Sequence, residues 1–184
     1  MTIADPIALR RSPSRGRSMP LPDLLQATDL AADAVLQGRY NHLLPASGLP
    51  DDQRWFTRID GDDRLDIWLI SWVPGHATEL HDHGDSVGAL TVLSGSLDEY
   101  HWNGRELAQR RLDAGDQAAF NRGWVHDVVW APPTIGPGPV EVPIPTLSVH
   151  AYSPPLTEMS YYDVGQDHTL RRQRTELTQH PEAS

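Results

Sequence analysis

The sequence predicts a mainly β fold, an antiparallel β-barrel or sandwich that follows short N-terminal helices. Between Trp55 and Tyr152 the chain is a succession of short runs in which apolar and polar residues alternate. Turn-forming dipeptides separate many of these runs: PG at 74–75, SG at 94–95, NG at 103–104, AG at 114–115 and RG at 122–123. Short strands with such regular turns are typical of antiparallel barrels and sandwiches.

The N-terminal part of the chain divides into two segments. Residues 1–19 are rich in Arg, Ser and Pro and have no apolar period, so we expect a disordered arm. In residues 20–40 most apolar side chains recur every three or four residues, which predicts one or two short helices. The helices lead through the turn-prone segment PASGLPDD into the β region.

The strands are predicted from the alternating runs in order along the chain. They cover residues 55–60, 65–72, 77–83, 87–95, 96–102, 105–112, 117–121, 126–130 and 146–152. The segment 132–145 is too rich in proline for a central strand, and we expect a loop at the rim of the barrel that gates access to a site.

The end of the chain and the composition complete the domain prediction. Residues 166–184 are polar, and we expect a tail with a frayed helix through LRRQRTEL at 170–177. With 184 residues, of which 39% are hydrophobic and 22% charged, the chain fits one compact domain, here placed at residues 20–165.

Charge and hydropathy exclude several classes of partner. The net charge of −10 disfavours nucleic acid and anionic lipid, and no apolar run approaches the roughly 18–20 residues of a membrane span. An export signal requires an apolar region after its basic residues, and no such region follows Arg10 and Arg11. We therefore expect a cytoplasmic protein without nucleic-acid or membrane partners, and we expect a monomer.

The chain contains neither cysteine nor lysine. Disulfides, thiolate metal sites, cysteine nucleophiles and lysine Schiff bases are therefore excluded. A bound metal would have to take imidazole or oxygen ligands, which directs attention to the nine histidines.

Three histidines form the candidate metal site. His81 and His83 are two residues apart in HDH, so in a strand both rings leave the same face of the sheet. His126 begins the apolar run HDVVW directly after a glycine turn, where a barrel can return a third ligand to the pair. Three imidazoles on one face of an octahedral ion leave about three positions for substrate and dioxygen, as an oxygenase needs. A carboxylate ligand is the alternative, and the nearby candidates are Glu79, Asp82 and Asp85.

Four segments in this order resemble the cysteine dioxygenase family of the cupin superfamily. They are WFTR at 55–58, HDHGDSVGALTVLSGSL at 81–97, VHDVVW at 125–130 and SVHAYSPPL at 148–156, within a resemblance that covers about residues 55–162. The resemblance implies a cupin-type, jelly-roll β-barrel with one Fe(2+) per chain on His81, His83 and His126. It also implies that L-cysteine and O2 are converted to cysteine sulfinate.

The resemblance also implies roles for four further residues. Arg58 would bind the substrate carboxylate, for which the forked guanidinium is well suited. Tyr152 matches the family's catalytic tyrosine. Ser148, His150 and Tyr152 alternate along one strand and should form a buried hydrogen-bonded chain, in which His150 directs the hydroxyl of Tyr152. Gly88 matches the cysteine that animal members link to the tyrosine, so the crosslink cannot form, and we expect water or a side chain in that space.

Three alternative functions remain open at this point. Another small thiol, such as 3-mercaptopropionate, could replace cysteine, although relatives that act on it tend to carry glutamine at the position of Arg58. A non-catalytic cupin that binds a metal or ligand is the second alternative, because a barrel does not imply a reaction. A third is an isomerase or other cupin enzyme that uses manganese, nickel or zinc, since histidines alone do not select the metal.

Overall fold

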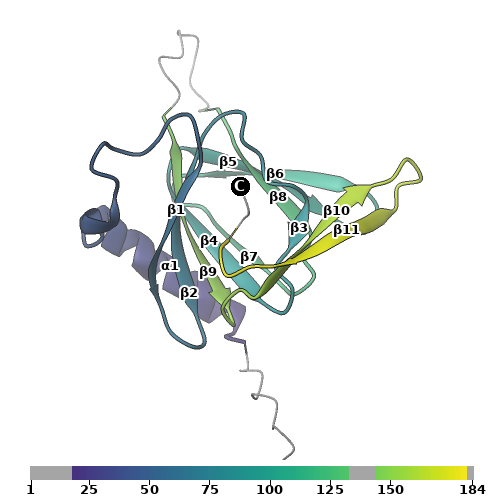
Figure 1. Cartoon of the computed structure of the whole chain (residues 1–184), viewed down its shortest axis with the longest axis horizontal. Coiled ribbons are helices and arrows are strands. Elements are labelled where there is room, and N and C mark those ends of the chain that lie inside the picture. The colour runs from purple at the N-terminus through teal and green to yellow at the C-terminus, as the bar shows by residue number, and fades with distance from the viewer. Residues whose placement is uncertain (1–17, 133–143, 182–184) are drawn as a thin grey trace, which may run out of the picture.

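Two antiparallel sheets face each other in the computed structural model, and one helix lies outside them (Figure 1). The structure describes residues 18–132 and 144–181. Nearly all of the predicted N-terminal arm and of the proline-rich loop lies outside the described residues. Helix α1 covers Leu21–Leu36, and a short 3-10 helix follows at Asn41–Leu43.

The first sheet has five strands in the order β1-β2-β9-β4-β7. Their bounds are Trp55–Gly61 for β1, Asp66–Trp72 for β2, Thr146–Ser153 for β9, Val87–Ser94 for β4 and Gln117–Phe120 for β7. Helix α1 packs on the outer face, where Leu24, Leu69 and Val149 are fully buried. Because both faces of β2 and β9 are covered, nearly every residue of these two strands is buried, the polar ones included.

The second sheet has six strands in the order β11-β10-β3-β8-β5-β6. Their bounds are Leu170–Leu177 for β11, Glu158–Val164 for β10, His81–Asp82 for β3, His126–Trp130 for β8, Ser96–Trp102 for β5 and Leu107–Asp113 for β6. The main core lies between the sheets and takes Trp72 and Leu90 from the first sheet and Leu97 and Val128 from the second. Apolar burial on this scale is the dominant stabilising contribution to such a domain.

The predicted fold class, a mainly β, cupin-type antiparallel barrel after an N-terminal helical segment, is confirmed. Every predicted strand segment contains a strand, although 77–83 contributes only His81–Asp82. Within the described part of the chain, no helix has the length and apolar character needed to span a membrane.

The predicted C-terminal helix is wrong. Residues 170–177 form β11, which pairs along its length with β10, a strand that the sequence reading missed. Arg, Gln, Glu and Leu are good helix formers, but an edge strand owes its conformation to its neighbour in the sheet, which overrides local propensity. After β11 the chain turns back, and the ring of His180 packs against Phe56 and Trp68, at centroid distances of 6.0 and 5.8 Å. Residues 170–177 are therefore an edge strand of the second sheet.

Candidate metal centre

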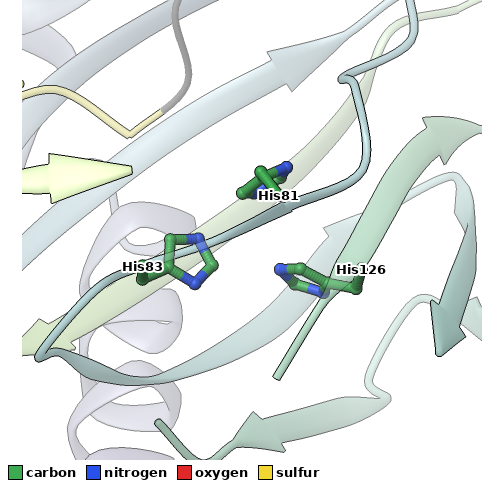
Figure 2. Close-up of side chains that lie close together, drawn as sticks. All are labelled: His81, His83 and His126. Carbon is green, nitrogen blue, oxygen red and sulfur yellow. The ribbon is translucent and has the colours of Figure 1, made fainter. Parts of the chain in front are cut away.

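Three histidine rings converge inside the barrel, as the HDH spacing predicts. His81 on β3 lies opposite His126 on β8 in the sheet register, and His83 follows two residues after His81. Their candidate ligand nitrogens all lie within 4.8 Å of one another, and all three side chains are buried. Figure 2 shows the three rings facing one another.

The carboxylates considered as alternative ligands lie outside this cluster. Glu79 is exposed and forms an ion pair with Arg174, at 2.7 Å between Oε2 and Nη1. Asp82 accepts a hydrogen bond of 2.6 Å from the hydroxyl of Tyr162. Among the described residues, the cluster of candidate ligands consists of histidines alone, without Asp85 or any other carboxylate.

Two of the histidines are oriented by their Nδ1 atoms. The ring of His81 donates to the carbonyl oxygen of Glu79 at 2.7 Å, and that of His126 donates to Oε1 of Glu99 at 2.8 Å, because both oxygens can only accept. Nε2 of each ring is thus left as a lone-pair donor. Nε2 of His126 is buried and has no hydrogen-bond partner in the part of the chain that the structure describes. A buried nitrogen in this state, beside two other imidazoles, fits a metal ion with nitrogen ligands.

His81, His83 and His150 are held neutral by burial. Burial, with a smaller effect of His126, lowers the pKa of His81 to about 3. Burial and the neighbouring His81 and His126 lower the pKa of His83 well below its usual value. Burial likewise lowers the pKa of His150 to about 3. Neutral imidazole is the form that binds metal, so His81 and His83 are ready to act as ligands near pH 7.

These shifts predict that the metal-free protein loses stability in mild acid. Between about pH 6.5 and pH 3 the unfolded chain binds protons that folded His81 and His150 do not, and the lowered pKa of His83 acts in the same direction. The stability that these groups contribute is therefore fully present above about pH 6.5 and is lost as the pH decreases. Each group contributes at most about 1.4 kcal/mol per pH unit. Urea unfolding of the metal-free protein at pH 7.5, 6 and 5 measures the loss, and equal stability at all three values would contradict it.

The predicted hydrogen-bonded chain on β9 is present and buried. Nδ1 of His150 lies 3.2 Å from the hydroxyl of Tyr152, and Nε2 lies 2.9 Å from Oγ of Ser148. Trp72 donates from Nε1 to the same Oγ at 2.8 Å. Burial raises the pKa of Tyr152 above its usual value, against the opposing charge of Arg54, so the phenol keeps its proton. The rings of Tyr152 and His83 are 4.8 Å apart, which places this chain against the histidine cluster.

The space beside Gly88 is filled by a side chain. A Cβ atom built on Gly88 would lie 2.5 Å from Cε2 of Phe120 and 3.3 Å from Cδ1 of Tyr152. The buried ring of Phe120 also contacts two of the candidate ligands, with centroids 5.8 Å from His83 and 4.7 Å from His126. The sequence predicts water or a side chain beside Gly88, and the structure shows that the side chain of Phe120 occupies this space.

Replacing Gly88 with alanine is expected to destabilise the protein by about 1–3 kcal/mol, because the added methyl group overpacks against Phe120. Thermal unfolding should show a decrease of several degrees in Tm. The double variant Gly88→Ala/Phe120→Leu should be more stable than the sum of the two single changes implies. A Gly88→Ala variant as stable as the parent would show that the ring moves aside at no cost.

Arg58 does not lie at the histidine cluster. Its side chain is 45% exposed, and Nε forms an ion pair of 2.7 Å with Asp66, at the hairpin end of β1 and β2. The role of Arg58 in binding substrate stays a prediction, and in the structure its guanidinium is paired with Asp66. The buried carboxylate of Asp66 requires a cation of its own, and Arg58 supplies it.

Arg54 is the arginine that faces the interior. Its guanidinium carbon lies 4.0 Å from the centre of the Trp72 ring, beside the hydrogen-bonded chain of β9. Burial lowers the pKa of Arg54 to about 10, and its positive charge acts on the pKa values of His81, His150 and Tyr152. The sequence reading missed it, although Arg54 and Arg58 are four residues apart and alternate onto the same side of the strand.

Glu99 is the second residue that the sequence reading missed. It alternates with buried Leu97 along β5 and is fully buried. Burial alone would raise the pKa of Glu99, but hydrogen bonds and charge from His126 and Arg110 outweigh it and hold the pKa at about 2. The sequence did carry a signal for it, because a charged residue at an inward-facing position of an alternating strand indicates a buried, paired charge.

Comparison with known proteins agrees with this geometry. The family model for cysteine dioxygenase type I matches residues 47–165. Cysteine dioxygenase type 1 of Danio rerio is 27% identical over 119 residues, which cover 61% of this chain and 58% of that protein. The Rattus norvegicus protein of the same name is 26% identical over 118 residues, with the same coverage of 61% and 58%. The match therefore spans less than two thirds of the length of these relatives.

Solved structures with a similar fold are more distant. The polyketide cyclase RemF from Streptomyces resistomycificus has a TM-score of 0.48 and 17% identity, over 62% of this chain and 74% of that chain. A cupin superfamily protein from Desulfitobacterium hafniense has a TM-score of 0.43 and 11% identity, over 57% of this chain and 80% of that chain. The family model, by contrast, covers more than half of the sequence, including all three histidines. The chain belongs to the cysteine dioxygenase type I family.

Proposed function

We propose that this protein is an iron(II)-dependent dioxygenase that converts L-cysteine and O2 to cysteine sulfinate. The observation that carries the proposal is the buried cluster of His81, His83 and His126, which lies beside the Tyr152 chain in a member of the cysteine dioxygenase family. In the reaction the O–O bond breaks and two S–O bonds form. Sulfur is oxidised by losing the electrons that reduce dioxygen, so no further reductant is needed.

The three histidines would hold the metal through nitrogen atoms that face one another. A ferrous ion held there would supply open coordination positions for a thiolate, an amine and dioxygen. Because His81 and His83 are neutral at pH 7, the ligands do not cancel the charge of the ion, and an anionic thiolate is attracted to it. The histidines do not themselves select iron, so metal analysis of the purified protein belongs to the test.

Arg54 is proposed to bind the substrate carboxylate. Its guanidinium is mostly withdrawn from solvent against Trp72, and its charge acts on Tyr152 and His150. Withdrawal from water strengthens the attraction between a guanidinium and an anion, and the planar fork of donors matches the two carboxylate oxygens. The sequence suggested this role for Arg58, whose guanidinium is paired with Asp66.

Tyr152 is proposed to donate a hydrogen bond from its hydroxyl to the reacting groups. Ser148 accepts from Trp72, and when Ser148 in turn donates to Nε2 of His150, the proton of that ring lies on Nδ1. The ring then donates to the oxygen of Tyr152, which leaves the phenolic proton free to point into the site. The raised pKa of Tyr152 keeps that proton in place near pH 7.

Replacing Tyr152 with phenylalanine is expected to lower kcat by about 10-fold to 100-fold, since a hydrogen bond to a charged partner contributes about 1.5–3 kcal/mol. Metal content should stay at the parent level, because the hydroxyl is not among the proposed ligands. Steady-state oxygen uptake and metal analysis of the same preparations test both points. An unchanged kcat would remove Tyr152 from the catalytic machinery.

Oxygen consumption by the iron-loaded protein tests the function. L-cysteine, 3-mercaptopropionate and cysteamine are compared, with sulfinic acids identified by mass. Uptake with L-cysteine supports the proposal. Preference for 3-mercaptopropionate would keep the chemistry and change the substrate, a possibility that the affinity of Arg54 for any carboxylate favours. Absence of uptake with all three thiols, despite bound ferrous iron, would favour a non-catalytic metal-binding protein.

A further inference from the structure

The three candidate ligands differ in what lies behind them. His126 has a carboxylate behind it, since its Nδ1 donates to Glu99 at 2.8 Å. His81 has a neutral carbonyl oxygen in the same position. Within the described ranges, no hydrogen bond joins the ring of His83 to the protein, and behind it lie only the rings of Phe120 and Tyr152, besides the other two histidines. Support from the surrounding protein is therefore strongest for His126.

Glu99 is held in place from three directions. Oε1 accepts from His126 on β8 and also from Nε1 of Trp124, at 3.0 Å. Oε2 forms an ion pair with Nε of Arg110, which lies directly opposite Glu99 in the pairing of β5 with β6. The side chain is 0% exposed, so neither oxygen exchanges its partner for water. A carboxylate fixed in this way can only accept from His126, and it determines which ring nitrogen carries the proton.

We propose that Glu99 is a positioning residue that fixes the Nδ1–H form of His126 and makes this imidazole the anchoring ligand of the metal. Glu99 would supply, through its hydrogen bond with His126, a negative charge that imidazole ligands lack. Carboxylates behind metal-binding histidines raise the basicity of the ring and typically change metal affinity by about 10-fold to 100-fold. The inference goes beyond the proposed function, because it concerns the affinity for a divalent ion and requires no thiol.

Replacing Arg110 should change metal affinity in the opposite direction to replacing Glu99. The guanidinium of Arg110 offsets part of the negative charge of Glu99. Removing the guanidinium therefore makes the electrostatic potential at His126 more negative. Glu99→Gln should therefore weaken metal binding, whereas Arg110→Gln should leave it unchanged or strengthen it. Damage to the packing of β5 and β6 would instead weaken binding in both variants. Glu106→Gln is the matched control, because it removes the same charge from the exposed β5–β6 turn.

The experiment is titration calorimetry with Co²⁺, repeated with Fe²⁺ under anaerobic conditions, on the parent chain and the three variants. We expect the Kd of Glu99→Gln to be about 10-fold to 100-fold higher than that of the parent, with Glu106→Gln equal to the parent. A Kd of Glu99→Gln within twofold of the parent would overturn the proposal, as would an equal loss in Arg110→Gln.

Nitrogen NMR of the metal-free parent provides a second test that requires no variant. His126 should appear as the Nδ1–H form, with its proton strongly deshielded by the carboxylate of Glu99. Finding the Nε2–H form would overturn the proposal even where Glu99→Gln fails to fold. Both measurements omit thiol and dioxygen. Failure of the thiol oxidation assay therefore leaves this inference standing, and failure here leaves that assay unaffected.

Discussion

Replacing Arg54 with methionine is expected to lower kcat/KM for L-cysteine by about 100-fold to 1,000-fold. The substitution keeps an unbranched side chain beside Trp72 but removes the buried cation proposed to bind the carboxylate. Truncating one partner of a buried, hydrogen-bonded charge pair costs about 2–5 kcal/mol, which corresponds to a loss of this order. Oxygen uptake over a range of cysteine concentrations measures the effect.

Two controls separate carboxylate binding from general damage. Arg58→Met removes a half-exposed arginine from the same strand region and should change kcat/KM by no more than about twofold. Cysteamine lacks a carboxylate, so its turnover should be nearly equal in the parent and in Arg54→Met. A large loss in Arg58→Met with normal turnover in Arg54→Met would reverse the roles given to the two arginines.

Replacing His81 with alanine is expected to abolish both metal retention and thiol oxidation. His81 is one of the three candidate nitrogen ligands, and it is buried. Four-ligand zinc sites bind with about 10–16 kcal/mol, so one ligand corresponds to roughly 3 kcal/mol and a loss of affinity above about 100-fold. Metal content after dialysis and oxygen uptake should both fall to background.

The exposed His76 provides the control for this change, since His76→Ala removes an imidazole five residues earlier without touching the cluster. The metal content of His76→Ala should equal that of the parent. Retention of a full equivalent of metal by His81→Ala would contradict the three-histidine site. In that case a carboxylate such as Asp85 would have to be reconsidered as a ligand.

Local pattern was sufficient for the barrel and for most of the site. Alternation and turn dipeptides act over a few residues, so the strands and the shared face of His81 and His83 follow directly from them. The same period of two placed Ser148, His150 and Tyr152 in one buried row. These predictions required no knowledge of which strands are neighbours.

The errors concern contacts between strands that are distant in sequence. Arg54 directly precedes β1 and Arg58 lies within it, and only the folded arrangement of β1 and β2 puts Trp72 beside the first and Asp66 beside the second. β11 is a strand because β10 is available to pair with it, although its composition suits a helix. Glu99 acquires its role from Arg110 and His126 on two different strands. Cross-strand neighbours of this kind are fixed by tertiary structure and not by local propensity.

Isotope labelling tests the central claim most directly. The iron-loaded protein is supplied with L-cysteine under ¹⁸O2 in unlabelled water, and the product is analysed by mass spectrometry. A dioxygenase built on the three histidines predicts cysteine sulfinate in which both sulfinate oxygens carry the label. Cystine without label, or a sulfinate with an oxygen from water, would contradict the account.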